Sequence, residues 1–77
     1  MDSTEVITGE VTAVHLAYCS VSLRKELPSI PEGSHITFDM ADWKGSRNPR
    51  PGQIVAMEEL TLFSRGWRAL SAKPIQI

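Results

Sequence analysis

Apolar and polar residues alternate along two short stretches of the chain, and this alternation predicts β-strands. Between residues 17 and 23 the apolar side chains fall on every second position: Ala17, Cys19, Val21 and Leu23. Between residues 35 and 40 the same spacing holds for Ile36, Phe38 and Met40. Because successive side chains of a strand point to opposite faces, each stretch predicts a strand with one buried face.

Two further stretches have strand character with a less regular alternation. Residues 6–16 are rich in valine, isoleucine and threonine, which favour strands, and Gly9 inside this run predicts a bulge or a tight bend. Residues 53–63 are ambiguous because Ile54, Met57 and Leu60 also fall at helical spacing. The Pro-Gly turn before this stretch and its β-prone end favour a strand, with a helix as the alternative.

Turn-forming residues mark the connections between these stretches. Residues 24–34 contain two prolines and a glycine, and residues 41–52 are polar and turn-rich, with a short helical turn allowed at 41–44. The sequence SRG at 64–66 predicts a hairpin turn before a last strand over residues 67–75. Five short strands at this spacing predict an all-β fold, a small five-stranded antiparallel OB-like barrel. We expect residues 1–77 to form this single domain, with residues 1–5 as a frayed tail.

Composition and charge narrow the functional classes. A chain of 77 residues with a formal net charge of −1 has room for one modest core and offers no bulk attraction for nucleic acid, so any basic site must be local. The single cysteine, Cys19, excludes an internal disulfide framework and fits a reducing compartment. No apolar run approaches the ~20 residues that span a bilayer. The acidic, polar start also differs from a signal peptide, so we expect a cytoplasmic protein without membrane contact.

Three short motifs follow the pattern of a family of small β-barrels. Residues 51–58, PGQIVAME, resemble a fourth-strand motif EGQxVxFE. Residues 64–72, SRGWRALSA, resemble a fifth-strand motif xxGxQAxxV, and residues 9–12, GEVT, resemble a first-strand GxVK. These are motifs of the cold-shock domain family, which the chain resembles over most of its length from Gly9. The resemblance implies an OB fold that binds single-stranded DNA or RNA.

The aromatic positions of that family are mostly changed in this chain. The family's second-strand motif GFGFI corresponds to residues 17–21, AYCSV, which keep one ring at Tyr18. Its third-strand motif VFVHF corresponds to residues 36–40, ITFDM, where Thr37 and Asp39 replace an outward ring and an outward histidine. Because stacking contributes ~1–3 kcal/mol per base, the loss of rings predicts weak or altered binding. Asp39 is also expected to repel phosphate.

Eight residues form the predicted nucleic-acid contact set, because positive charges neutralise phosphates and exposed rings stack on bases. The set comprises Tyr18, Trp43, Lys44, Arg47, Arg50, Arg65, Trp67 and Arg68. Tyr18 is the favoured contact because it shares the polar face of its strand with Ser20 and Ser22. Trp43 and Trp67 would form a new stacking platform if they lie on the same side. The competing interpretation places Trp43 as a cap on one end of the barrel and Trp67 in the core.

Motifs for catalysis or metal binding are missing from the sequence. His15 and His35 have no cysteine or carboxylate at ligand spacing, Cys19 falls on an apolar strand face, and no catalytic motif joins the serines, histidines and aspartates. We therefore predict a non-enzymatic module without metal or cofactor that binds single-stranded RNA or DNA. Two alternatives stay open. One is a protein-interaction module that uses a polar surface including Thr37 and Asp39, and the other is a homo-oligomer subunit that packs through residues 60–63.

Overall fold

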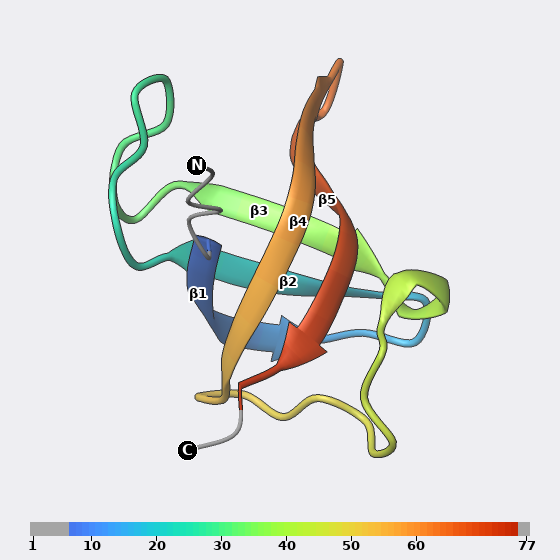
Figure 1. Ribbon diagram of the computed structural model, residues 1–77. Helices are drawn as coiled ribbons and strands as arrows, with labels where there is room; N and C mark the ends of the chain where they lie inside the picture. The colour runs from blue at the N-terminus through green and yellow to red at the C-terminus, as the bar shows by residue number, and fades with distance from the viewer. Residues whose placement is uncertain (1–6, 76–77) are drawn as a thin grey trace, which may run out of the picture.

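The strands follow one another along the chain in the predicted order (Figure 1). The computed structural model describes residues 7–75. Its elements are β1 (Ile7–Val14), β2 (Tyr18–Leu23), β3 (His35–Asp39), β4 (Ile54–Phe63) and β5 (Gly66–Pro74), with a short 3-10 helix, η1 (Met40–Asp42), after β3. The tail predicted for residues 1–5, and Val6 at the start of the first predicted strand, lie outside the described residues.

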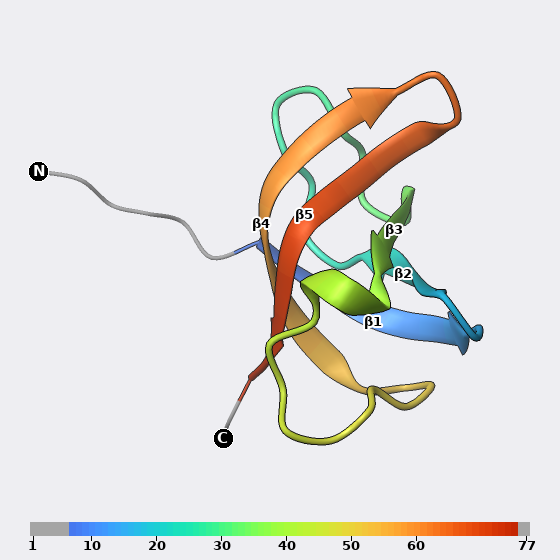
Figure 2. The same ribbon diagram turned by 90° about the vertical axis from the view of Figure 1, so that its right-hand side faces the viewer.

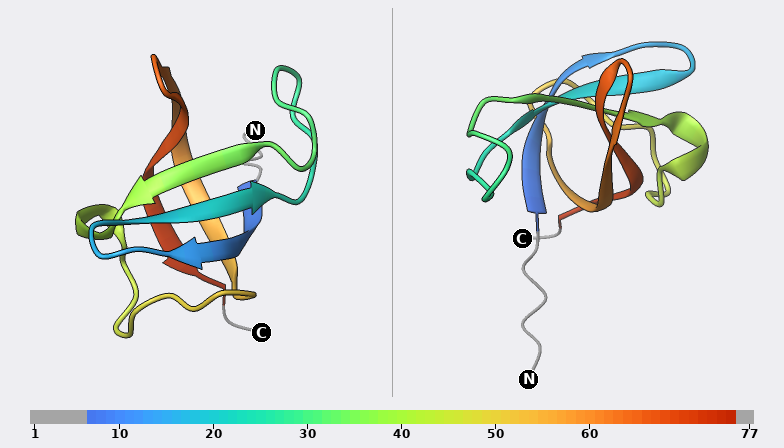
Figure 3. Two further views of the ribbon diagram at one scale, coloured as in Figure 1. Left: turned by 180° about the vertical axis from the view of Figure 1, so that it is seen from behind. Right: turned by 90° about the horizontal axis from the view of Figure 1, so that it is seen from above.

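The strands close into a barrel in the order β1-β2-β3-β5-β4, which is consistent with the predicted OB-like barrel. Neighbouring strands are antiparallel except where β3 meets β5. That closing contact is parallel and pairs Ile36 with Trp67 and Thr37 with Arg68. Figure 3 shows the ring of strands from above. The parallel contact is what brings the third strand, from the middle of the chain, beside the C-terminal hairpin.

The core fills the inside of this ring with the alternating residues of the predicted strands. The fully buried large side chains are Val11, Cys19, Val21, Leu23, Ile36, Phe38, Val55 and Met57. The alternation therefore predicted the buried residues within β2 and β3 correctly, whereas Ala17, expected on the same face, lies before β2 and is exposed. One core residue comes from a segment where no burial was predicted: Ile30, in the proline-containing β2–β3 connection, is buried and is held by backbone hydrogen bonds to Leu27 in both directions.

Gly9 lies in the part of β1 that pairs with both neighbouring strands. It pairs with Leu23 of β2 on one side and with Val55 of β4 on the other. A Cβ atom at this position would overlap the side chain of Val21 and lie 2.9 Å from the methyl carbon of Met57. The bulge itself lies at Thr12, where the register of β1 against β2 shifts. Gly9 is thus explained by the close approach of strands at a barrel corner.

The ambiguous segment is a strand, β4, and a local kink explains its helix-like spacing. Glu59 has a φ of 58°, a left-handed conformation that interrupts the alternation of inward and outward side chains. Before it, Met57 pairs with Ala72; after it, Leu60 pairs with Ala69, and all four pack in or against the core. The inward positions on either side of the kink are therefore three residues apart. This spacing imitates one turn of a helix.

The β4–β5 hairpin and the β3–β4 loop lie at opposite ends of the molecule (Figures 1 and 2). Within residues 7–75 the pairing of β1 with β4 ends at Met57, so the second half of β4 pairs there only with β5 and the hairpin projects beyond the ring. Within residues 7–75, no helix has the length and apolar character needed to cross a membrane. The helical turn expected at 41–44 is η1, which begins one residue earlier, at Met40.

Candidate nucleic-acid interface

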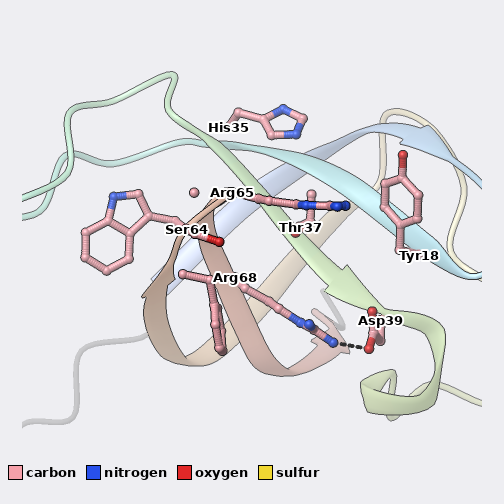
Figure 4. A pocket seen from close by; sticks show the side chains of 10 residues that line it. Tyr18, His35, Thr37, Asp39, Ser64, Arg65 and Arg68 are labelled. Carbon is pink, nitrogen blue, oxygen red and sulfur yellow. Dashed lines mark hydrogen bonds and ion pairs between the residues drawn. The ribbon is translucent and has the colours of Figure 1, made fainter.

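A groove of about 430 Å³ lies where the outer face of β2 and β3 meets the projecting β4–β5 hairpin (Figure 4). Strand alternation explains which side chains of β3 line the groove. Ile36 and Phe38 point into the core, so the alternate residues His35, Thr37 and Asp39 point outward. The hairpin forms the second wall. The residues that line the groove are Tyr18, His35, Thr37, Asp39, Phe63, Ser64, Arg65, Gly66, Trp67 and Arg68.

Tyr18 supplies an accessible aromatic ring at one end of this groove. It begins β2 directly after the β1–β2 turn, and 40% of its surface is exposed. His15, on the other side of that turn, stacks against the tyrosine ring with the ring centroids 4.5 Å apart and the planes inclined by 24°. The histidine holds the tyrosine ring in place from one side. Tyr18 therefore has the exposure that a base-stacking contact requires.

Asp39 and Arg68 form an ion pair across the groove. Nη2 of Arg68 donates a hydrogen bond to Oδ2 of Asp39, and the guanidinium carbon of Arg68 lies 5.6 Å from the centre of the Phe63 ring. The two-residue hairpin turn makes this possible, because its register puts Phe63 and Arg68 on the same face of the hairpin. The negative charge of Asp39 is thus offset by a neighbouring cation. Arg68 in turn is already paired with a carboxylate.

Arg65 is the cation of the groove whose charge has no such partner among the described residues. It lies at the exposed tip of the hairpin, and its guanidinium points along the groove toward Tyr18 (Figure 4). Arg65, Arg68 and Asp39 together give the groove one net positive charge. A chain with a net charge of −1 therefore has a locally positive face here.

The second predicted cluster, around Trp43, lies at the other end of the barrel. The Trp43 ring stacks on Phe38 with centroids 5.6 Å apart, and its Nε1 donates a 2.7 Å hydrogen bond to the carbonyl oxygen of Arg47. A Cβ atom on Gly45 would lie 2.7 Å from the indole, so the loop folds tightly over the ring. Trp43 thus caps the barrel. It also lines a second groove together with Arg47 and Arg50, so these three predicted contacts meet there.

The remaining predicted contacts divide between these two places. Trp67 both packs against the core and lines the first groove, so each interpretation of this residue describes part of its surroundings. It does not share a groove with Trp43, and the two tryptophans form no common platform. Lys44 is exposed and lines neither groove. Four of the eight predicted residues, Tyr18, Arg65, Trp67 and Arg68, therefore meet in one groove.

Two features of this face differ from the sequence-based expectation. Ser20 was expected on an exposed polar face but is only 7% exposed, with Ala13 of β1 and Thr37 of β3 as its cross-strand partners. Phe63 was expected only as an oligomer contact, yet it lines the groove. The signal for Phe63 was the hairpin turn at 64–66, since a two-residue loop fixes which side chains of the hairpin share a face.

Cys19 is a core residue with an inert thiol. Its Sγ donates a hydrogen bond to Sδ of Met40 at 3.6 Å, and burial raises the pKa of the thiol. A higher pKa leaves less thiolate, which is the reactive form. Among residues 7–75, no three histidine, cysteine, aspartate or glutamate side chains gather into a metal-binding cluster.

The geometry of the groove carries the functional argument for this chain. No family model matches the sequence, and no curated protein matches it. The resemblance to cold-shock domains consists of short motifs, and the barrel order shows the fold alone. Because one fold serves many functions, the function must be argued from the residues of the groove.

Proposed function

We propose that this protein is a non-enzymatic module that binds single-stranded nucleic acid in the groove between β2, β3 and the β4–β5 hairpin. One observation carries the proposal: an exposed tyrosine, Tyr18 of β2, lines the same groove as Arg65 of the hairpin, which has no carboxylate partner among the described residues. The two residues lie far apart along the chain. A base stacked on Tyr18 places the adjoining phosphate within the positive field of the groove.

The composition of the groove supports modest affinity. Tyr18 and Phe63 are its large exposed rings, because Trp67 is half-buried, and Phe63 lies beside the Arg68 guanidinium. Each stacked base contributes ~1–3 kcal/mol, so one free platform at Tyr18 and one shared with Arg68 support weak, salt-sensitive binding. The exposed Arg47 and Arg50 at the opposite end of the barrel add charge outside the groove.

A fluorescence titration tests this proposal, because the two tryptophans occupy different surroundings. In the Trp43→Phe variant the remaining indole, Trp67, lines the groove and reports directly on its occupancy. Titration with single-stranded oligonucleotides at low salt should give saturable quenching that weakens as salt is added. A flat titration at low salt, together with unchanged anisotropy of a labelled oligonucleotide, would overturn the proposal.

Two substitutions locate the contact. Tyr18→Ala removes the stacking ring, and Arg65→Ala removes a positive charge of the groove, so each should weaken binding severalfold. Arg24→Ala is the matched control for the charge change, because Arg24 is exposed and lines neither groove. Equal weakening by Arg24→Ala and Arg65→Ala would show that binding follows total charge and does not use the groove.

Self-association is a second candidate, favoured by the exposed apolar residues of the hairpin. Leu62 is 62% exposed, and the neighbouring Phe63 is exposed as well. Both lie on the half of β4 that pairs with β5 alone, which leaves one edge of this strand without a partner in the described chain. Sedimentation at increasing protein concentration tests this candidate, with Leu62→Lys as the variant that should abolish any dimer.

A further inference from the structure

A carboxylate stands beside the stacking ring of the groove. Tyr18 and Asp39 are direct cross-strand partners in the β2–β3 register, so both side chains leave the same face of the sheet. The Asp39 side chain is 44% exposed, and Figure 4 shows it at the same end of the groove as Tyr18. A base stacked on Tyr18 therefore has an edge within reach of Asp39.

The ion pair with Arg68 sets what this carboxylate can offer to a base. An ionised carboxylate only accepts hydrogen bonds, and its two oxygens have about four lone-pair positions. Arg68 donates to Oδ2 and leaves Oδ1 and the other lone pair of Oδ2 available. The guanidinium has further N–H donors beside the one that it uses. The groove thus presents two adjacent acceptors next to a donor.

Guanine is the base whose edge complements this arrangement. Its Watson–Crick edge carries two adjacent donors, N1–H and the N2 amine, next to the O6 acceptor. Adenine and cytosine each present one donor beside an unprotonated ring nitrogen, which a carboxylate repels. Thymine and uracil present one N–H between two carbonyl oxygens.

We propose that the groove prefers guanine among the bases, and that Asp39 is the residue that determines this preference. The inference rests on the proposed function, since it names the base that the single-strand site selects. Arg68 acts here as a positioning residue, because it holds the carboxylate and lies beside the expected place of O6. The charge of Asp39 thereby serves base selection, although the same charge opposes phosphate.

The test compares oligothymidylates of about ten nucleotides, a length within the range of OB-fold sites, that differ at one central position. Guanine at that position should bind about tenfold more tightly than thymine, adenine or cytosine, because a two-pronged contact discriminates on this scale. Inosine, which lacks the N2 amine, should bind with intermediate affinity. Asp39→Asn should remove most of the preference, because an amide offers one acceptor and one donor.

The control variant is Glu58→Gln, which makes the same carboxylate-to-amide change at an exposed position outside the groove. It should keep the guanine preference, and unfolding midpoints of both variants check that the barrel is intact. Equal affinity for all four bases would overturn the inference and leave the proposed function standing. Binding of no oligonucleotide would overturn both. A guanine preference that persists in Asp39→Asn would overturn the role of Asp39.

Discussion

The indole ring of Trp43 lies face to face with the ring of Phe38, with centroids 5.6 Å apart and planes inclined by 16°. Phe38 is fully buried in the barrel core, so its partner closes the core at that end. The hydrogen bond from Trp43 Nε1 to the Arg47 carbonyl ties the β3–β4 loop to the same ring. Trp43 therefore contributes to the stability of the barrel, although the nearby basic residues Lys44 and Arg47 are exposed.

Substitution of Trp43 should therefore change folding more than binding. Trp43→Phe keeps the ring but loses the hydrogen bond, which should lower the free energy of unfolding by about 1 kcal/mol. Trp43→Ala also removes the stacked ring and should cost about 2–3 kcal/mol, somewhat less than for a fully buried tryptophan. Denaturant unfolding measures both values. Oligonucleotide affinity at a temperature where each variant is folded should stay within twofold of the parent, and a large loss there would contradict this assignment.

The close approach of Gly9 to Val21 predicts a strong effect of one added methyl group. Gly9→Ala should destabilise the barrel by about 2 kcal/mol, because the new Cβ overlaps the valine and also approaches the Ser22 carbonyl oxygen at 3.1 Å. Val21→Ala in the same chain makes room for it. The double variant should consequently be more stable than the sum of the two single losses, as a double-mutant cycle would show. Additive losses would mean that the overlap is relieved in another way.

Strand alternation predicted much of this fold because each short strand has one face inside a narrow ring. Cys19, Val21 and Phe38 could be placed in the core from their spacing alone. Positions 53–63 form the strand that was favoured, and their helix-like spacing arises because the left-handed residue Glu59 changes which positions face inward. The burial of Ile30 was not predicted, because it depends on a loop that folds back onto the core and such a loop has no regular spacing of apolar residues.

The candidate site was less predictable than the fold, because long-range pairing assembles it. Tyr18 and Arg68 meet only because β3 joins β2 on one side and β5 on the other. The sequence showed aromatic and basic residues together at two places, and local clustering could not tell which of them would share a groove with Tyr18. Trp43 is an example. Its basic neighbours in the sequence indicated a ligand-binding site, whereas the structure shows that its own ring packs on Phe38.

The pH dependence of stability should include an alkaline contribution from Cys19. Burial raises the pKa of its thiol above the ordinary value of 9.0, so the folded state keeps the proton where the unfolded thiol has lost it. The stability from this group is therefore complete below the unfolded pKa and falls as the pH rises through the folded pKa. Unfolding free energies from neutral to alkaline pH should fall less steeply in Cys19→Ala than in the parent. Parallel curves would show that the thiol makes no such contribution.

The left-handed residue in β4 predicts a substitution that stabilises the protein. Glu59 has a φ of 58°, which costs a residue with a Cβ about 1–2 kcal/mol, whereas glycine adopts it without that cost. Part of the gain is lost to the greater freedom of glycine in the unfolded chain, so Glu59→Gly should raise the free energy of unfolding by about 0.5–1 kcal/mol. Glu58→Gly, one residue earlier in ordinary strand geometry, is the matched control and should lower stability by a similar amount. Thermal and denaturant unfolding of the pair measure the difference, and a loss of stability in both variants would mean that Glu59 holds its conformation without strain.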